Sequence, residues 1–297
     1  MPSLNVSLFG KFYISYDNHH LLGFEGIKLQ ELFCYLLLFR DRPHPRETLA
    51  ELLWSHSPQS RKNLRKALWQ LQTALDVEVS LNSHDFLSIE SDWIQLNSHP
   101  HLWLDTAVLE QSFQQVQNLP GSQLDPTSAQ MLQVVIEHYR GDLLESCYAD
   151  WCLLERERYR HMYLAILDKL MAYCEISQQY AAGISYGEIA LRYDRARERT
   201  HRRLMRLFHF SGYRTEALRQ YARCVQALAE ELSVEPTQQT RQLYEQIRVD
   251  SLQVSPLPQL PLPAEKPSTL ALILSQIQQA QSLLAEAQRQ LQRQFKE

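Results

Sequence analysis

The sequence has few of the features by which most enzymes and membrane proteins are recognised. It contains only eight glycines, and the phosphate-binding pattern Gly-x-x-x-x-Gly-Lys-[Ser/Thr] does not occur, so no nucleotide site is expected. The zinc-protease pattern His-Glu-x-x-His is also missing. Nowhere do about 18 apolar residues follow one another, as a membrane-spanning helix requires. We therefore predict a protein that is not an enzyme, binds no cofactor or metal and does not enter a membrane.

Cysteine is scarce and scattered. The five cysteines are odd in number and include no Cys-x-x-Cys pair, which argues against a zinc site or a disulfide framework. We expect reduced, buried thiols at Cys34, Cys147, Cys152, Cys174 and Cys224. The chain opens without a basic segment followed by an apolar run, so we also expect a cytoplasmic protein. A formal net charge of −4 gives no general attraction to nucleic acid, so any DNA-binding surface has to be local.

The first hundred residues change from strand periodicity to helix periodicity and back. Alternating apolar and polar side chains indicate strands, and apolar side chains at every third or fourth position indicate helices. The pattern predicts strands at 4–9, 12–16, 86–90 and 93–96, and helices at 27–40, 46–54 and 58–75. The last two strands flank Ser91-Asp92, which is typical of a β-hairpin. This order predicts an α+β winged helix-turn-helix domain at residues 1–98.

The next segment, residues 99–250, is predicted to be an all-α domain. Strand periodicity is lost after about Asp105, and helical periodicity recurs at 105–117, 127–140, 149–178, 180–193, 197–211, 213–231 and 236–248. Gln179-Tyr180-Ala181 and Gly212-Tyr213-Arg214 open two of these helices about 33 residues apart, close to the tetratricopeptide period of about 34. Tetratricopeptide-like helical repeats are therefore expected.

The C-terminal part differs in composition from both domains. Residues 251–268 are rich in proline and are predicted to be an extended linker. Residues 269–297 are predicted to be a glutamine-rich helix, in which Leu270, Leu274 and Ile277 begin a pattern of four- and three-residue steps. This pattern fits a coiled coil that would make the protein a homo-oligomer. A single helix that docks on the repeat domain fits the pattern equally well.

The third helix of the winged domain is the predicted DNA-binding element. At about 100° per residue its leucines share one face, while basic side chains cluster on the opposite face. No acidic residue occurs between Glu51 and Asp76, so the local potential is positive. The predicted DNA-binding residues are Arg46, Arg61, Lys62, Asn63, Arg65, Lys66, Trp69, Gln70 and Thr73.

Side-chain chemistry suggests two classes of contact. Lys66, Gln70 and Thr73 suit base edges in the major groove, because Lys pairs with guanine, Gln with adenine, and the Thr methyl with thymine. Phosphate contacts are expected from Arg61, Lys62, Asn63 and Arg65. The alternative is a basic face that is merely solvated. Trp69 has an alternative too, since it would also fit a contact with the second domain.

Several motifs in this order resemble those of the SARP-type bacterial transcriptional activators. The hairpin Leu8-Phe9-Gly10-Lys11-Phe12 is similar to the start of that family. The helices Arg46-Glu47-Thr48-Leu49-Ala50-Glu51-Leu52-Leu53-Trp54 and Arg61-Lys62-Asn63-Leu64-Arg65-Lys66-Ala67-Leu68-Trp69 resemble its second and recognition helices. In the second domain, Tyr139-Arg140-Gly141-Asp142-Leu143-Leu144 and Glu230-Glu231-Leu232-Ser233-Val234-Glu235-Pro236 resemble the entry and exit of its bacterial transcriptional activation domain.

The resemblance implies a sequence-specific regulator that binds double-stranded promoter DNA and activates transcription by recruiting RNA polymerase. A repressor with the same DNA contacts is one alternative. A protein-interaction adaptor, whose winged helix does not bind DNA, is another. The chain departs from the family at Ser233, where glycine is usual, so the turn there is expected to be less tightly wound.

Overall fold

The computed structural model describes residues 4–55, 57–79, 86–97 and 102–252. The described residues up to Ser251 belong to one compact unit. The predicted linker and C-terminal helix lie almost wholly outside the described residues, so the coiled coil stays a prediction.

An antiparallel ladder opens the described chain, as predicted. β1 (Leu4–Ser7) pairs with β2 (Tyr13–Tyr16), and β2 pairs with β3 (His19–His20). Asp17 and Asn18, which join β2 to β3, both have positive φ. Two successive positive φ angles mark a type I′ turn, whose twist matches that of a tight hairpin.

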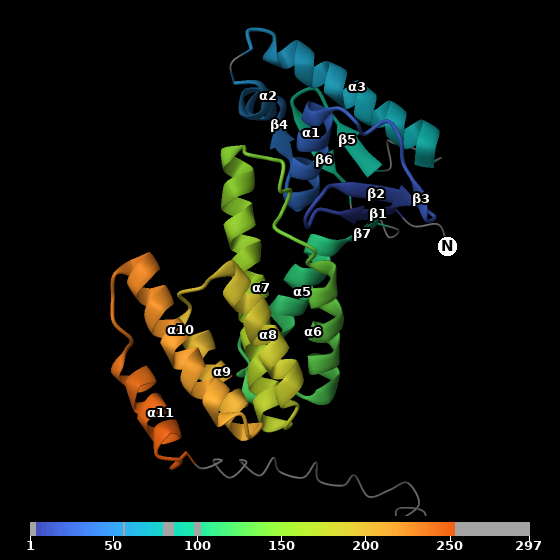
Figure 1. Cartoon of the computed structure of the whole chain (residues 1–297). Coiled ribbons are helices and arrows are strands. Elements are labelled where there is room, and N and C mark those ends of the chain that lie inside the picture. Colours follow the sequence, from blue (N-terminus) through green and yellow to red (C-terminus); the bar gives the residue numbers. More distant parts are fainter. Residues whose placement is uncertain (1–3, 56, 80–85, 98–101, 253–297) are drawn as a thin grey trace, which may run out of the picture. The chain divides into compact units, whose positions relative to one another are not determined.

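Three helices and a second sheet complete the winged helix (Figure 1). They are α1 (Ile27–Leu38), α2 (Arg46–Trp54) and α3 (Ser60–Val79), with β4 (His44–Pro45), β5 (Leu87–Ile89) and β6 (Trp93–Leu96) in the order β4-β6-β5. Their core contains Phe33, Leu49, Leu71 and Phe86, each fully buried. The predicted α+β winged helix-turn-helix is confirmed, and β5 with β6 forms its wing.

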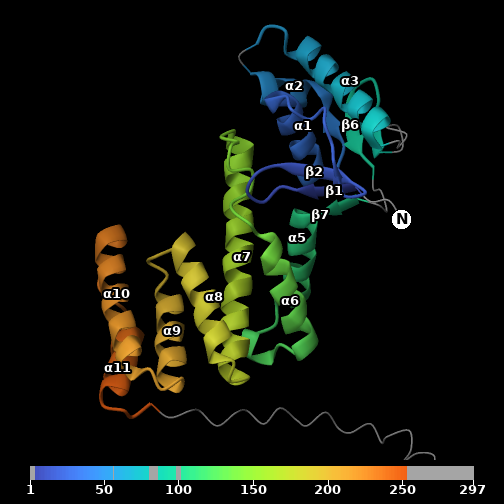
Figure 2. The same cartoon turned by 45° about the vertical axis from the view of Figure 1, so that its right-hand side comes forward.

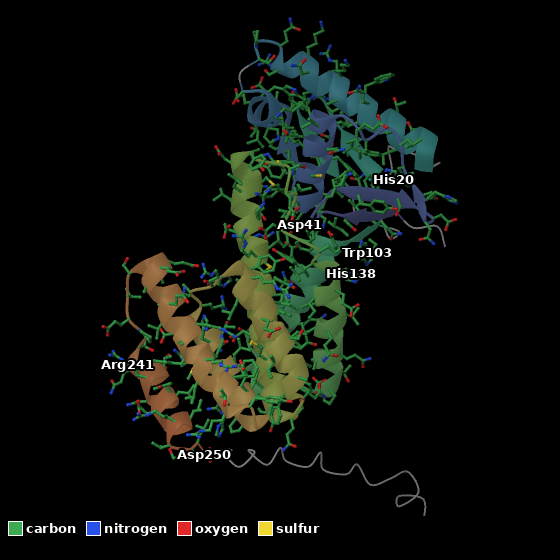
Figure 3. All side chains as sticks on the ribbon, viewed as in Figure 1. His20, Asp41, Trp103, His138, Arg241 and Asp250 are labelled. Carbon is green, nitrogen blue, oxygen red and sulfur yellow. The ribbon has the colours of Figure 1, made fainter. Side chains whose placement is uncertain are left out.

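A short strand that the alternation pattern did not predict lies between the wing and the helical domain. β7 (Leu102–Leu104) adds to the first sheet as a parallel partner of β1. Its central residue, Trp103, lies beside His138 at the end of a helix of the second domain (Figure 3), with ring centroids 5.1 Å apart. β7 therefore connects the first sheet directly to the helical part.

The helical domain has the elements that the periodicity predicts. They are α5 (Asp105–Val116), α6 (Pro126–His138), α7 (Asp150–Ile176), α8 (Tyr180–Tyr193), α9 (Glu198–Phe210), α10 (Arg214–Leu232) and α11 (Gln238–Arg248), with the 3-10 turn η1 (Gly121–Gln123) after α5. Successive helices run antiparallel and stack side by side (Figure 2). The predicted all-α, repeat-like domain is confirmed.

The turn after α10 keeps the geometry of a glycine turn although serine occupies it. Ser233 has φ 57° and lies in the left-handed region. The amide of Ser233 donates to the Ala229 carbonyl and the amide of Val234 to the Leu228 carbonyl, at 3.2 and 3.3 Å. Serine thus takes the left-handed conformation that is usual for glycine, which costs about 1 kcal/mol for a residue with a Cβ, and the expectation of a less tightly wound turn stays a prediction.

Candidate nucleic-acid interface

The outer face of α3 presents a row of cationic and polar side chains. Its inner face packs through four buried leucines at positions 64, 68, 71 and 75, each at most 3% exposed. Six of the predicted contact residues are exposed on the other face: Arg61, Lys62, Arg65, Lys66, Trp69 and Gln70. No acidic side chain lies on α3 before Asp76. The face therefore combines positive charge with a large aromatic surface.

Two of the predicted contact residues have partners within α3 and the turn before it. The side-chain amide of Asn63 donates to Ser57 Oγ at 3.1 Å, and Ser57 Oγ also accepts from the backbone amide of Gln59. Thr73 Oγ1 donates to the Trp69 carbonyl at 2.8 Å. Asn63 and Thr73 are both half-buried. Asn63 thus orders the start of the helix, and only the methyl group of Thr73 keeps the role that the sequence suggested.

The two predicted contact arginines nearest to α2 are also engaged. Arg46 Nη1 donates to the Glu90 carbonyl at 3.0 Å, and its backbone amide donates to the Asp92 carbonyl at 2.9 Å, so Arg46 holds the wing against α2. Arg61 pairs with Glu47 across the surface, where both side chains are at least 70% exposed. An exposed pair of this kind contributes little stability, so Arg61 can exchange Glu47 for another anion at little cost.

A concave surface lies between α2, α3 and the wing and encloses a volume of about 610 Å³. Its lining includes three arginines, two acids and one tryptophan, namely Arg46, Arg61, Arg65, Glu47, Asp92 and Trp93, the last at the start of β6. Trp93 is 46% exposed. Trp93 is not among the contact residues predicted from the sequence, although an aromatic residue next to a hairpin tip is a signal that could have identified it.

Trp69 projects from the middle of α3 with 64% of its surface exposed. Both views place α3 on the side of the winged domain that faces away from α5–α11 (Figures 1 and 2). The alternative interpretation, in which Trp69 packs on the repeat helices, therefore does not hold within residues 4–252.

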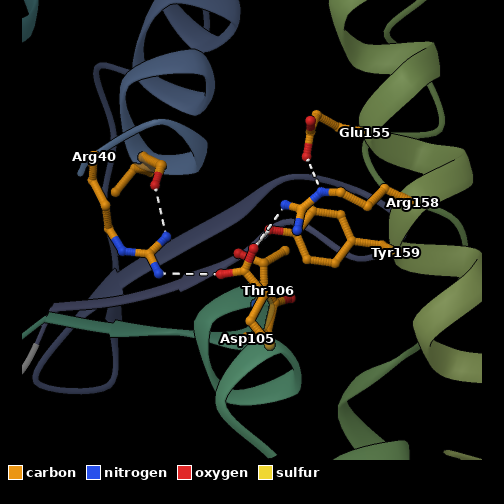
Figure 4. Close-up of polar contacts among 8 residues, drawn as sticks. Arg40, Asp105, Thr106, Glu155, Arg158 and Tyr159 are labelled. Atoms are coloured by element: carbon orange, nitrogen blue, oxygen red, sulfur yellow. Dashed lines mark hydrogen bonds and ion pairs between the residues drawn. The ribbon is translucent and has the colours of Figure 1, made fainter. Parts of the chain in front are cut away.

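A polar cluster connects this domain to the helical domain. The carboxylate of Glu110 on α5 accepts from Arg40, just after α1, at 3.2 Å, and from Arg158 and Tyr159 of α7 at 2.7 and 2.8 Å. Figure 4 shows Arg40, Arg158 and Tyr159 converging from the two sides. Burial, followed by the charge of Glu110, raises the pKa of Tyr159. The network fixes the end of α1 relative to α5 and α7.

Asp105, the first residue of α5, is the most deeply buried acid of this connection. It is 1% exposed, and its carboxylate accepts from the backbone amides of Leu8, Phe9 and Thr106 at 2.7–3.0 Å. Desolvation raises its pKa to about 6, although the three amides act in the opposite direction. A carboxylate of the helical domain thus holds the end of β1 in the winged domain.

One catalytic pattern in the sequence has no matching structural context. Gly183-Ile184-Ser185-Tyr186-Gly187 has the Gly-x-Ser-x-Gly spacing of hydrolase nucleophile elbows, which hold the serine on a sharp turn from a strand into a helix. Here the segment lies inside α8. Its two glycines instead allow close packing, because an added Cβ would come within 2.7 Å of Met171 at Gly187 and 3.0 Å of Cys174 at Gly183.

Among the described residues there is no group of three or more His, Cys, Asp or Glu side chains that could hold a metal ion. Within the same residues, no helix combines the length and apolar character needed to cross a bilayer.

Comparisons with known proteins agree with the fold. The family model of the bacterial transcriptional activator domain matches residues 104–248. The chain is also similar to Mycobacterium tuberculosis EmbR, solved in complex with a low affinity phosphopeptide, with a TM-score of 0.65 and 18% sequence identity. This similarity covers 86% of the present chain and 67% of that chain and shows a shared fold. No curated protein matches the sequence.

Proposed function

We propose that the chain is a SARP-type regulator, because the bacterial transcriptional activator domain model matches residues 104–248, and that it binds promoter DNA sequence-specifically and activates transcription by recruiting RNA polymerase. The observation that carries this proposal is the exposed cationic face of α3, which has four basic side chains in six positions and no acid. A helix with such a face suits the major groove, as the third helix of a winged helix does.

The geometry refines the contact classes suggested by the sequence. Lys66 and Gln70, exposed in the middle of α3, are the proposed base-reading side chains. Lys62, Arg65 and Arg61 surround them and would neutralise phosphates. Arg46 would act by holding the wing and by adding charge to the concave surface. Asn63 would act through the Ser57 turn rather than on the DNA.

Trp69 and Trp93 add apolar area next to these cations. Trp69 lies one turn beyond Lys66 on the same face, and Trp93 lines the concave surface with Arg65. Each would pack on sugar or base methyl groups at the edge of the groove. The wing tip itself carries Glu90 and Asp92, so strong phosphate binding is expected from α3 and not from the tip.

The proposed partner of the helical domain is RNA polymerase, and self-association is proposed for the C-terminal segment. Deletion of the residues after Asp250 tests the second point by light scattering. An unchanged number of chains per particle in the deleted protein would refute it.

The decisive experiment is a mobility shift with the DNA upstream of the protein's own gene and of neighbouring genes, over a salt series. We compare the wild type with Arg65→Ala/Lys66→Ala. The matched control is Arg219→Ala/Arg223→Ala, which removes the same charge from exposed positions of α10. With about five phosphates neutralised, log K should fall with log salt at a slope of −4 to −5, and the α3 variant should lower this magnitude by about 2.

The outcomes separate the candidate functions. Loss of the sequence-preferring shift in the α3 variant alone, with unchanged circular dichroism, supports the regulator. No shift of the folded wild type at low salt with any genomic fragment would instead favour the adaptor. A promoter–reporter assay then separates an activator from a repressor, because only an activator raises the signal.

A further inference from the structure

Two cysteines lie side by side where the helical domain meets the winged domain. Cys147 belongs to the loop between α6 and α7, and Cys152 lies in the first turn of α7, which starts at Asp150. Their thiols are hydrogen-bonded to each other. Both are free thiols in this structure. The two thiols are therefore neighbours in the fold, although no Cys-x-x-Cys motif reveals the pair in the sequence.

The two thiols differ in access and in charge environment. Cys147 is partly exposed, whereas Cys152 is fully buried. The hydrogen bond from Cys152 lowers the pKa of Cys147, and the guanidinium of Arg156 on α7 acts in the same direction. Glu31 of α1 opposes these effects. An accessible thiol that ionises readily, backed by a buried thiol, is the arrangement in which an oxidant attacks the first sulfur and the second resolves the product.

The loop that carries Cys147 holds the first sheet in place. The amide of Gly10 donates to the Asp142 carbonyl, and the amide of Leu144 donates to the Leu8 carbonyl, both at 2.8 Å. Arg156 donates to the carbonyls of Leu143, Leu144 and Cys147. A bond between the two sulfurs would therefore form next to the contacts that join the two domains.

We propose that Cys147 and Cys152 form an intramolecular disulfide when the protein meets hydrogen peroxide. The Cys147 thiolate attacks one peroxide oxygen, the O–O bond breaks, and hydroxide leaves, which takes up a proton to give water. The resulting sulfenic acid is attacked by the Cys152 sulfur. The S–O bond breaks, the S–S bond forms, and a second water leaves with the Cys152 proton. Two thiols lose two electrons and two protons, and one peroxide is reduced to two waters.

The other cysteines lack this arrangement. Burial raises the pKa of Cys174 to about 11 and that of Cys224 to about 12. Cys34 of α1 is 1% exposed and buried next to the pair, and burial raises its pKa as well. Buried thiols with raised pKa values react slowly with peroxide. Selectivity for one pair out of five cysteines is the expected signature.

The test is oxidation of the full chain with hydrogen peroxide, followed by blocking of free thiols and tryptic peptide mapping. Cleavage after Arg140 and Arg156 releases both cysteines in one peptide. An internal disulfide therefore appears as loss of two hydrogens and absence of blocking on that peptide. The wild type should fall from five blockable thiols to three, and reductant should restore all of them.

Three variants make the test specific. Cys152→Ser should accumulate a sulfenic acid on Cys147 that dimedone traps, whereas Cys147→Ser should give no trapped adduct on this peptide. Cys224→Ser, the control, should oxidise as the wild type does. A peptide cross-linked through Cys34, equal oxidation of all cysteines, or full blocking of the 141–156 peptide after peroxide would each overturn the proposal. None of these outcomes depends on DNA binding.

Discussion

Replacing Asp105 by asparagine tests the buried connection between the two domains. The carboxylate lies under the end of β1 and accepts three backbone hydrogen bonds, yet desolvation outweighs them and raises its pKa from 3.8 to about 6. Asparagine has the same shape and retains one acceptor oxygen, but it does not titrate. The difference in pH dependence between the two proteins therefore reports this group alone.

The sign and size follow from proton linkage. Because the folded protein holds a proton that the unfolded chain has released, Asp105 contributes stability fully below pH 3.8, and this contribution is lost as pH rises through about 6. Each pKa unit is worth about 1.4 kcal/mol, so the full contribution is about 3 kcal/mol. Between about pH 4.5 and pH 7.5 the wild type should lose about 2 kcal/mol relative to Asp105→Asn.

Urea unfolding followed by tryptophan fluorescence, repeated across this pH range, measures the effect. Asp125→Asn is the control of opposite sign, because the amide and hydroxyl of Ser128 lower the pKa of the exposed Asp125. The wild type should therefore gain stability relative to that variant as pH rises through the acidic range. Parallel pH profiles for wild type and Asp105→Asn would refute the raised pKa. A wild type that gains stability with pH would show that the three amides outweigh desolvation.

Three further substitutions test the backbone and the core. Ser233→Gly should raise the free energy of unfolding in urea by about 0.5–1 kcal/mol, because glycine relieves the left-handed strain; a lower free energy of unfolding would contradict this. Gly121→Ala should lower thermal stability by about 1–3 kcal/mol, since its Cβ would overlap the Lys169 backbone, and an unchanged melting temperature would disprove the overlap. Leu71→Ala, on the inner face of α3, should lower the free energy of unfolding in urea by about 2–5 kcal/mol, and a loss below 1 kcal/mol would speak against tight packing there.

The helices could be predicted because their signals are local. α2 runs from Arg46 to Trp54 and α8 from Tyr180 to Tyr193, which are the predicted bounds. Both helices carry apolar side chains at three- and four-residue spacing, and turn-forming residues limit them. The exposed face of α3 was predictable for the same reason, since helical periodicity places its leucines on one face and its lysines and arginines on the opposite face.

Contacts between distant segments could not be predicted in this way. β7 has only three residues, too few for an alternation pattern, and its partner β1 lies almost a hundred residues earlier. Asp105 accepts from Leu8 over 97 positions, so nothing around it in the sequence shows that it is buried. Arg46 looks like a basic contact residue in sequence, and only the fold shows that it binds the Glu90 carbonyl of the wing.

The way in which the two domains are joined bears on how such a regulator would act. Between them the described chain passes through β7 and directly into α5, without a turn, and Asp105 and Glu110 then bind groups on the winged domain. Breaking a hydrogen bond to a buried charged group costs about 1.5–3 kcal/mol, so reorienting one domain against the other requires the loss of several such bonds. If α3 binds DNA as proposed, the position of the operator therefore also sets the direction in which the helical domain faces. Recruitment of polymerase should then depend on the helical phase of the operator, as expected for a rigid connection and not for a flexible tether.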